Sequence, residues 1–254
     1  MNLSSTIVPH VLAYHEIDDQ NSADVYCISP DTFMSHMWAA AHEAEHVKHS
    51  AYITFDDGHV SHMRWAVPIL NELGVQGHFF IPTSWVGSKH GYINWNDVRS
   101  IVNQGHRIGS HGATHIFLSA CNHSQLEQEV RSSRLTLEDK IGQAVTSISM
   151  PGGRWNDTVI RACAVAGYEE VYTSEPGMYR TATVQNNMRL PAVIGRFAVR
   201  RKTSLRTIAA YLEGDLFAVS RLRGMYRFRQ LAKRMIGDRG YQQIWSSLFR
   251  AMPG

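Results

Sequence analysis

Short β-rich runs alternate with helical patterns along the first 215 residues of this 254-residue chain. This alternation constrains the fold most, because parallel strands need long crossover connections and helices usually supply them. Seven strands are predicted, over 10–17, 50–55, 75–82, 105–111, 144–151, 168–174 and 189–195. Helices are predicted near 33–47, 60–73, 96–104, 124–141, 156–166 and 204–213. In the fourth of these, Ser124 with Glu127 three residues later predicts a capped start. The pattern indicates an α/β fold, most simply a parallel (β/α) barrel.

The composition agrees with one large globular domain, since 44% of the residues are hydrophobic and 19% are charged. The three cysteines show no CxxC spacing, which argues against a disulfide scaffold and suits a reducing compartment. The N-terminus lacks the basic and apolar regions of a signal peptide. No window reaches the roughly 20 apolar residues of a membrane span. We therefore expect a cytoplasmic protein that is either soluble or bound at a membrane surface.

Charge and histidine are distributed unevenly along the chain. Residues 196–254 hold 13 Lys/Arg against 3 Asp/Glu, whereas residues 1–195 hold 12 against 19. All 14 histidines fall within residues 10–123. This asymmetry predicts a catalytic barrel over 1–215 and a basic helical tail over 216–254.

Polar motifs follow three of the predicted strands. Asp56 and Asp57 follow the second strand, His111 and His115 follow the fourth, and the sequence PGGRW (151–155) follows the fifth. Active sites of parallel barrels gather at the carboxyl ends of the strands, so these motifs should share one face. Two imidazoles with one carboxylate are a common catalytic zinc set. The alternative for His111 and His115 is a pair of surface histidines or hydrogen-bonded core histidines.

A rival metal motif is present at residues 42–46. The sequence HEAEH matches the H-E-x-x-H of zinc metalloproteases, in which both histidines bind zinc and the glutamate is the base. Glu45 adds a charge inside the motif, and no third-ligand helix follows it. A solvated helix face therefore explains His42 and His46 better.

Five motifs together resemble the polysaccharide deacetylase family, which includes chitooligosaccharide deacetylases. They occur in the family's order between about residues 10 and 215, as LAYHEI (12–17), ITFDDG (53–58), HFFIPT (78–83), GHRIGSHGATH (105–115) and MPGGRW (150–155). The resemblance implies a distorted barrel of about seven strands. It also implies metal-dependent removal of N- or O-acyl groups from sugars.

The resemblance assigns different roles to the two adjacent carboxylates. It implies that Asp56 is the general base, and that Asp57, His111 and His115 bind a divalent metal, with zinc as the default. A cation would offset the repulsion between the carboxylates and keep both ionised.

The sequence departs from the family's usual pattern at three places. Gly112 stands where Ser or Thr is common, and the Arg that often precedes the proline of the later motif is missing before Pro151. Arg154 is the candidate to hold Asp56 in its place, with a surface role as the alternative. The family's late Leu-x-x-His is absent as well.

His15 is the candidate for the missing general acid. The sequence LAYH (12–15) resembles the strand of that late motif moved to the N-terminus, as in exopolysaccharide deacetylases with permuted motifs. In a closed barrel the first and last strands are neighbours, so the move can preserve geometry. The alternative is a hydrogen-bonded core histidine.

The predicted reaction is hydrolysis of an N-acyl group, most simply acetyl, on an amino sugar. The residues expected to contact the sugar are Pro151, Gly152, Gly153, Trp155 and Tyr14. Two alternatives stay open: a hydrolase of the same fold acting on a non-sugar C–N bond, and a non-catalytic glycan-binding relative.

The tail 216–254 combines an apolar helical stripe with dense positive charge. The stripe consists of Leu222, Met225, Tyr226, Phe228, Leu231, Met235 and Ile236. Such a segment can lie in an anionic membrane interface, which would suit a lipid-linked glycan. The alternative is a terminal helix packed on the barrel, and no nucleic-acid partner is expected.

Overall fold

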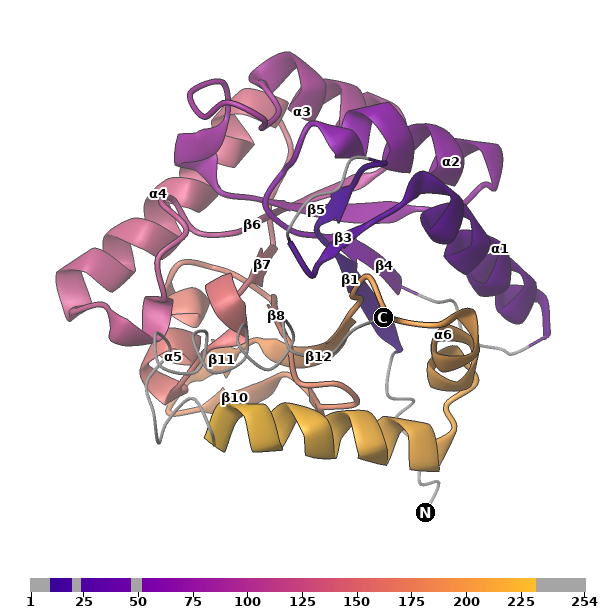
Figure 1. Cartoon of the computed structure of the whole chain (residues 1–254). Helices are drawn as coiled ribbons and strands as arrows, with labels where there is room; N and C mark the ends of the chain where they lie inside the picture. The colour runs from indigo at the N-terminus through magenta and orange to yellow at the C-terminus, as the bar shows by residue number, and fades with distance from the viewer. Residues whose placement is uncertain (1–9, 20–23, 47–51, 232–254) are drawn as a thin grey trace.

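Seven parallel strands close into a barrel in the computed structural model, which describes residues 10–19, 24–46 and 52–231 (Figure 1). The strands run in the order β1, β4, β5, β6, β7, β8, β12, and β12 pairs back onto β1. Their bounds are Val11–Tyr14, Tyr52–Phe55, Gly77–Ile81, Arg107–Ser110, Ser147–Ser149, Glu170–Thr173 and Ala192–Ala198. The predicted α/β barrel is confirmed, as is the pairing of its first and last strands.

Helices surround the barrel (Figure 1). The α-helices are α1 Pro30–His46, α2 Val67–Glu72, α3 Trp95–Asn103, α4 His123–Ile141, α5 Asp157–Val165 and α6 Leu205–Leu212. A π-helical turn, η1 His62–Ala66, precedes α2, and short 3-10 turns occupy η2 Thr83–Trp85, η3 Leu118–Ala120 and η4 Pro151–Gly153. A further helix covers 216–231. The predicted cap at Ser124 is wrong, because Asn122 and Gln125 form the capping box of α4.

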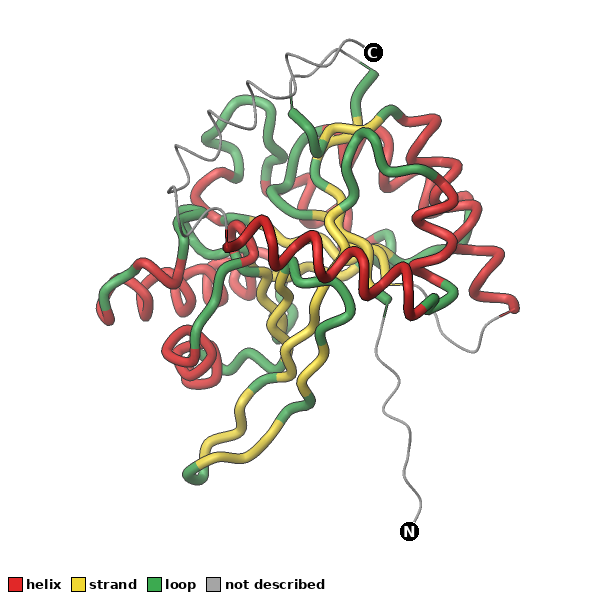
Figure 2. The backbone as a smooth tube through the Cα atoms, turned by 60° about the horizontal axis from the view of Figure 1, so that its bottom comes forward, coloured by secondary structure: helices red, strands yellow, loops and turns green. Residues whose placement is uncertain are grey.

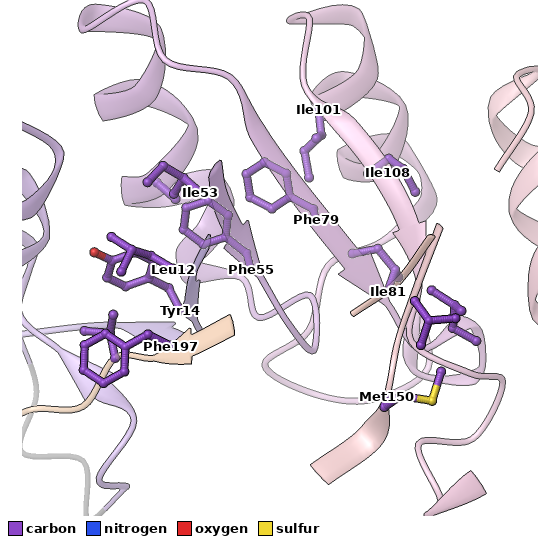
Figure 3. Close-up of a cluster of buried hydrophobic side chains, with 14 of the residues drawn as sticks. Leu12, Tyr14, Ile53, Phe55, Phe79, Ile81, Ile101, Ile108, Met150 and Phe197 are labelled. Atoms are coloured by element: carbon purple, nitrogen blue, oxygen red, sulfur yellow. The ribbon is translucent and has the colours of Figure 1, made fainter. Parts of the chain in front are cut away.

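The apolar core lies mainly between the strands and the helices (Figure 3). Strand side chains alternate between two faces, so each strand sends one set of residues to this core and the other set into the barrel. Leu12, Phe55 and Phe79 belong to the core outside the barrel, and the last two rings stack with centroids 4.5 Å apart. Phe80 and Tyr172 belong to a separate small cluster and flank the Arg196 guanidinium.

Short strands lie outside the barrel order. β2 Glu16–Ile17 pairs with β3 Cys27–Ile28, and β9 Tyr179–Arg180 adds to one edge of β12. β10 Thr183–Gln185 and β11 Met188–Leu190 form a hairpin that projects from the body (Figure 2). This hairpin displaces the last barrel strand, which was predicted over 189–195 and in fact runs over 192–198.

The structure contains neither a disulfide nor a membrane-spanning helix among the residues that it describes. Cys27, Cys121 and Cys163 are free thiols. Within the described ranges, no helix has both the length and the apolar character needed to cross a bilayer.

Candidate active site

Asp56 and Asp57 separate because the backbone turns sharply between them. The Asp56 N–H continues the ladder of β4 by donating to the Tyr14 carbonyl at 2.9 Å. Asp57 then takes a left-handed conformation with φ 74°, followed by Gly58 with φ 68°. Few L-residues adopt such a φ without cost, and glycine relieves the second position. As a result, Asp56 is buried and Asp57 faces the mouth of the barrel with its side chain 23% exposed.

Asp57, His111 and His115 converge on one point. The Nε2 atoms of His111 and His115 lie 3.3 and 3.1 Å from the Asp57 Oδ1 atom. One ligand atom from each of the three residues lies within 4.8 Å of the others. The structure therefore brings together the three side chains predicted as metal ligands.

The hydrogen bonds of this triad fit a cation. His111 Nδ1 lies 2.9 Å from the Ser149 carbonyl oxygen, which can only accept, so Nδ1 carries a proton and Nε2 is the ring nitrogen available to a metal. Asp57 Oδ1 is buried and has no hydrogen-bond donor among the described residues. Burial lowers the pKa of His111, but the charge of Asp56 and the contact with Asp57 outweigh it and raise that pKa. The Asp57 oxygen without a donor and the raised pKa of His111 both indicate a site that favours positive charge, as a divalent metal would supply.

A buried arginine, Arg196, holds Asp56. Its Nη1 and Nη2 atoms donate to the two carboxylate oxygens at 2.8 and 2.7 Å, and the two side chains are 1% and 5% exposed. The other donors reach the Thr54 hydroxyl, the Thr173 carbonyl and the Ser149 hydroxyl, so all five N–H groups are used. Burial raises the pKa of Asp56, but the charge and hydrogen bonds of Arg196 together with the charge of His111 outweigh it and hold that pKa well below its usual range. Asp56 is thereby fixed as an oriented carboxylate beside the triad.

Arg154 does not take this position, and the prediction that it holds Asp56 is corrected. Its guanidinium lies over the Phe117 ring, 4.4 Å from the centroid. The reason is topological: Arg154 follows η4 at the rim, whereas Arg196 enters the barrel from β12. A catalytic role for Arg154 at the rim stays a prediction.

His15 lies at the same mouth, directly after β1. The ladder of β1 and β4 pairs Tyr14 with Phe55, so His15 and Asp56 leave neighbouring strands at the same end of the barrel. Its ring packs on Tyr26 with centroids 4.7 Å apart, and its carbonyl contacts His62 Nε2. Its Nδ1 atom is buried and finds no hydrogen-bond partner within the described part of the chain. β1 therefore delivers a histidine to the mouth of the barrel, and its role as general acid stays a prediction.

Glu129 of α4 braces the loop between the two histidine ligands. The backbone N–H groups of Ala113 and Thr114 donate to its Oε2 atom at 2.8 and 2.9 Å, and the Thr114 hydroxyl donates to Oε1 at 2.6 Å. His115 takes a φ of 63°, which this bracing helps to hold. Gly112 lacks the hydroxyl expected there, but Glu129 supplies the loop with other contacts.

Trp85 supports His115 from the side. The two rings lie 4.7 Å apart, and the Lys89 Nζ atom sits 3.0 Å from the Trp85 centroid. Two backbone hydrogen bonds tie the η2 segment to the histidine loop, from Thr83 to Gly112 and from Ser84 to Ala113. The motifs of the sequence did not point to Trp85.

Of the predicted sugar contacts, Tyr14 is wrong. Its side chain is 1% exposed, contacts His36 Nδ1 at 3.3 Å and packs among core rings, and burial raises its pKa well above the usual value. Strand alternation explains this, because Tyr14 precedes His15 and so points to the opposite side.

The PGGRW motif lies at the rim, as predicted. Pro151 and Gly153 are buried, whereas Gly152 is exposed and approaches the Phe117 ring so closely that a Cβ would clash. Trp155 is half-buried against the core, with the Arg180 guanidinium 5.2 Å from its centroid. Sugar contact by these residues stays a prediction.

The rival HEAEH motif ends α1. The side chains of His42 and His46 lie outside those that the structure describes, so the protease hypothesis is neither supported nor opposed by their geometry.

The family model for polysaccharide deacetylase matches residues 43–171, just over half of the chain. The chain belongs to the polysaccharide deacetylase family. The matched region carries Asp56, Asp57, His111 and His115, which are the residues that form the site.

Curated relatives of this deacetylase family align over about half of the chain. YxkH of Bacillus subtilis is 30% identical over 125 residues, which are 49% of this chain and 44% of that protein. A chitooligosaccharide deacetylase of Sinorhizobium fredii is 32% identical over 127 residues, 49% of this chain and 57% of that protein. The alignments thus cover only about half the length of these relatives.

Solved deacetylase structures share the fold over a longer stretch. Streptococcus pyogenes PplD, solved with acetate, superposes with a TM-score of 0.69 at 19% identity, covering 81% of this chain and 98% of that one. IcaB from Ammonifex degensii superposes with a TM-score of 0.66 at 20% identity, covering 81% and 97%. At this identity the likeness concerns the fold alone.

Arg196 is the main site residue that sequence reasoning missed. A signal was present, because Arg196 is the one charged residue of the apolar run PAVIGRFAV (191–199). A charge inside a buried strand must be paired. The strand was predicted to end at 195, so Arg196 fell one residue outside it and was not recognised as a buried charge.

Proposed function

We propose that this protein is a metal-dependent hydrolase that removes an N-acetyl group from an amino sugar of a glycan. The observation that carries the proposal is the metal-binding triad Asp57, His111 and His115 with an ionised, arginine-held Asp56 beside it. Family membership and relatives named as chitooligosaccharide and peptidoglycan-N-acetylglucosamine deacetylases support it.

A bound divalent metal supplies Lewis-acid polarisation and makes a water easier to deprotonate. Asp56 takes the proton of the attacking water, since it is ionised and lies within the same pocket. Arg196 keeps that carboxylate charged and fixes its direction. As hydroxide bonds to the acyl carbon, the C–N bond breaks, and His15 donates the proton that the leaving amine needs. The products are acetate and the free amino sugar.

We further propose zinc as the native metal, because two imidazoles and one carboxylate are a common zinc ligand set. We also propose a lipid-linked glycan as substrate for an enzyme of the cytoplasm, peripheral to the membrane through 216–254. The basic, partly apolar sequence of the tail supports this setting.

Acetate release from N-acetylated chitooligosaccharides tests the activity, with metal content measured on the same samples. Asp56→Asn should abolish turnover and keep the metal, while Asp57→Asn should lose both. Asp139→Asn is a matched control, because the Asp139 side chain is 72% exposed on α4. Loss of metal in Asp56→Asn with retention in Asp57→Asn would reverse the two roles. Turnover of small amides without turnover of acetylated sugars would overturn the proposed substrate class.

A further inference from the structure

The outer face of the helix over 216–231 carries several large apolar side chains. Phe217 is 79% exposed, Phe228 is 70% exposed and Leu231 is 56% exposed. At about 100° per residue these three side chains fall on one side of a helix, and Met225, 43% exposed, lies at its margin. Large apolar side chains gathered on one exposed helix face mark an interaction surface.

The opposite face of this helix is fixed to the barrel. Val219 and Leu222 pack against the core, and a Cβ added to Gly177 would meet Val219 Cγ1 at 2.4 Å. Arg223 and Arg227 reach one oxygen of Glu175, at 3.1 and 3.2 Å. Leu222 and Tyr226, expected in the apolar stripe, therefore face inward, whereas Met225, Phe228 and Leu231 of that stripe are exposed. Met235 and Ile236 lie outside the described residues.

Positive charge lies among and beside these apolar side chains, since Arg221 falls between Phe228 and Met225 around the helix. Residues 216–231 contain four arginines and no acidic residue, and Arg221 is itself exposed. Arg223 and Arg227 share a single carboxylate, so their cluster with Glu175 stays positive. The sequence from 232 to 254 adds four further Lys/Arg against one Asp. The partner must therefore offer both apolar volume and negative charge, which an anionic bilayer does.

The helix also lies beside the mouth of the barrel. Glu175, which it binds, follows β8 at the carboxyl end of the strands. Gly177, which Val219 of the helix approaches, lies two residues further along the same loop. A surface bound to this helix would thus lie beside the carboxyl ends of the strands, where the active site opens.

We propose that Phe217, Met225, Phe228 and Leu231 form a docking surface that seats this helix in an anionic membrane interface, with the barrel mouth alongside the bilayer. The biological purpose of this placement rests on the proposed function. A sugar on a lipid carrier would meet the active site at the membrane. A second copy of the chain fits the surface less well, since two such helices would bring arginines face to face.

Vesicle sedimentation of the full chain tests the proposal. The wild type should bind phosphatidylcholine vesicles containing phosphatidylglycerol and should bind pure phosphatidylcholine weakly. Phe217→Ser with Phe228→Ser should reduce binding about tenfold or more, because both phenyl groups leave the interface. The control variant Leu135→Ser with Val165→Ser removes side chains that are 53% and 76% exposed on α4 and α5, and it should bind like the wild type.

Equal vesicle binding by the Phe217→Ser, Phe228→Ser variant and the wild type would overturn the proposal. So would a wild-type dimer in solution that this variant converts to a monomer, since a second copy would then cover the surface. Turnover of a soluble chitooligosaccharide should be the same in both proteins. That readout separates failure of docking from failure of the proposed activity, because vesicle binding needs no turnover.

Discussion

Replacing Arg196 with methionine should destabilise the fold and should also leave Asp56, the proposed general base, without the partner that orients it. The substitution keeps similar length but leaves Asp56 without its bidentate partner in a place where the two side chains are 1% and 5% exposed. Breaking a surface pair costs about 0–1 kcal/mol, whereas leaving one buried charge unpaired costs about 3–5 kcal/mol. Because both side chains are buried, the cost for this pair should be that of an unpaired buried charge, about 3–5 kcal/mol.

Urea unfolding at pH 7 measures the loss. With a slope of roughly 2–3 kcal/mol per molar urea, the midpoint should fall by about 1–2 M. The pKa of Asp56 is depressed in the folded state, so the pair stabilises the protein above the unfolded value of about 4. That stability is lost only as the pH falls toward the folded pKa, and pH 7 lies well above this window.

A double-mutant cycle isolates the interaction. Asp56→Asn combined with Arg196→Met should be less destabilised than the sum of the single variants, by about 3 kcal/mol, because neither buried charge is then left alone. Arg196→Lys keeps the positive charge but cannot make the bidentate contact. Its stability should lie between those of the wild type and Arg196→Met. Additive losses in the cycle would refute the reasoning, since they would show that Arg196 stabilises the barrel independently of Asp56.

Four other perturbations probe the acid, the metal ligands and the rival motif. His15→Ala should lower turnover about 10²–10⁴-fold with metal content unchanged, and near-normal turnover of an amide substrate would remove it from the mechanism. Trp85→Ala should weaken metal affinity about tenfold in a competition titration, with Trp85→Phe close to the wild type. Glu129→Ala strips a braced loop of three hydrogen bonds and should cost about 2–4 kcal/mol of unfolding free energy in urea, together with weaker metal binding. Replacing His42 and His46 with alanine should leave metal content unchanged, and loss of metal there would revive the protease hypothesis.

The strand order and the metal triad were predictable because their signals are local. Each strand is a short apolar run, and the Asp56–Asp57 pair, His111 and His115 stand after strands whose carboxyl ends meet. The choice of Asp57 rather than Asp56 as the ligand came from the resemblance to the deacetylase family. Barrel closure then made the position of His15 predictable from the neighbouring first and last strands.

The features that were missed depend on contacts between distant residues. Arg196 meets Asp56 across 140 residues of chain, and the hairpin before β12 shifted the predicted strand end away from it. Tyr14 was wrongly predicted to contact the sugar, although adjacent residues of a strand point to opposite faces and Tyr14 therefore points away from the side of His15. Trp85 stands on a 3-10 turn whose packing against His115 leaves no periodic pattern in the sequence.

The closure of β12 onto β1 has a consequence for biosynthesis. Translation proceeds at about 5–20 residues per second, so the codon of Arg196 is read on the order of ten seconds after that of Asp56. Until β12 emerges from the ribosome and docks, the nascent barrel has an open seam between β1 and β8, and Asp56 has no counter-charge from Arg196. The ion pair of Asp56 and Arg196 is therefore completed last, by the strand that also seals the barrel, and a chain arrested before β12 would lack both the pair and the closure.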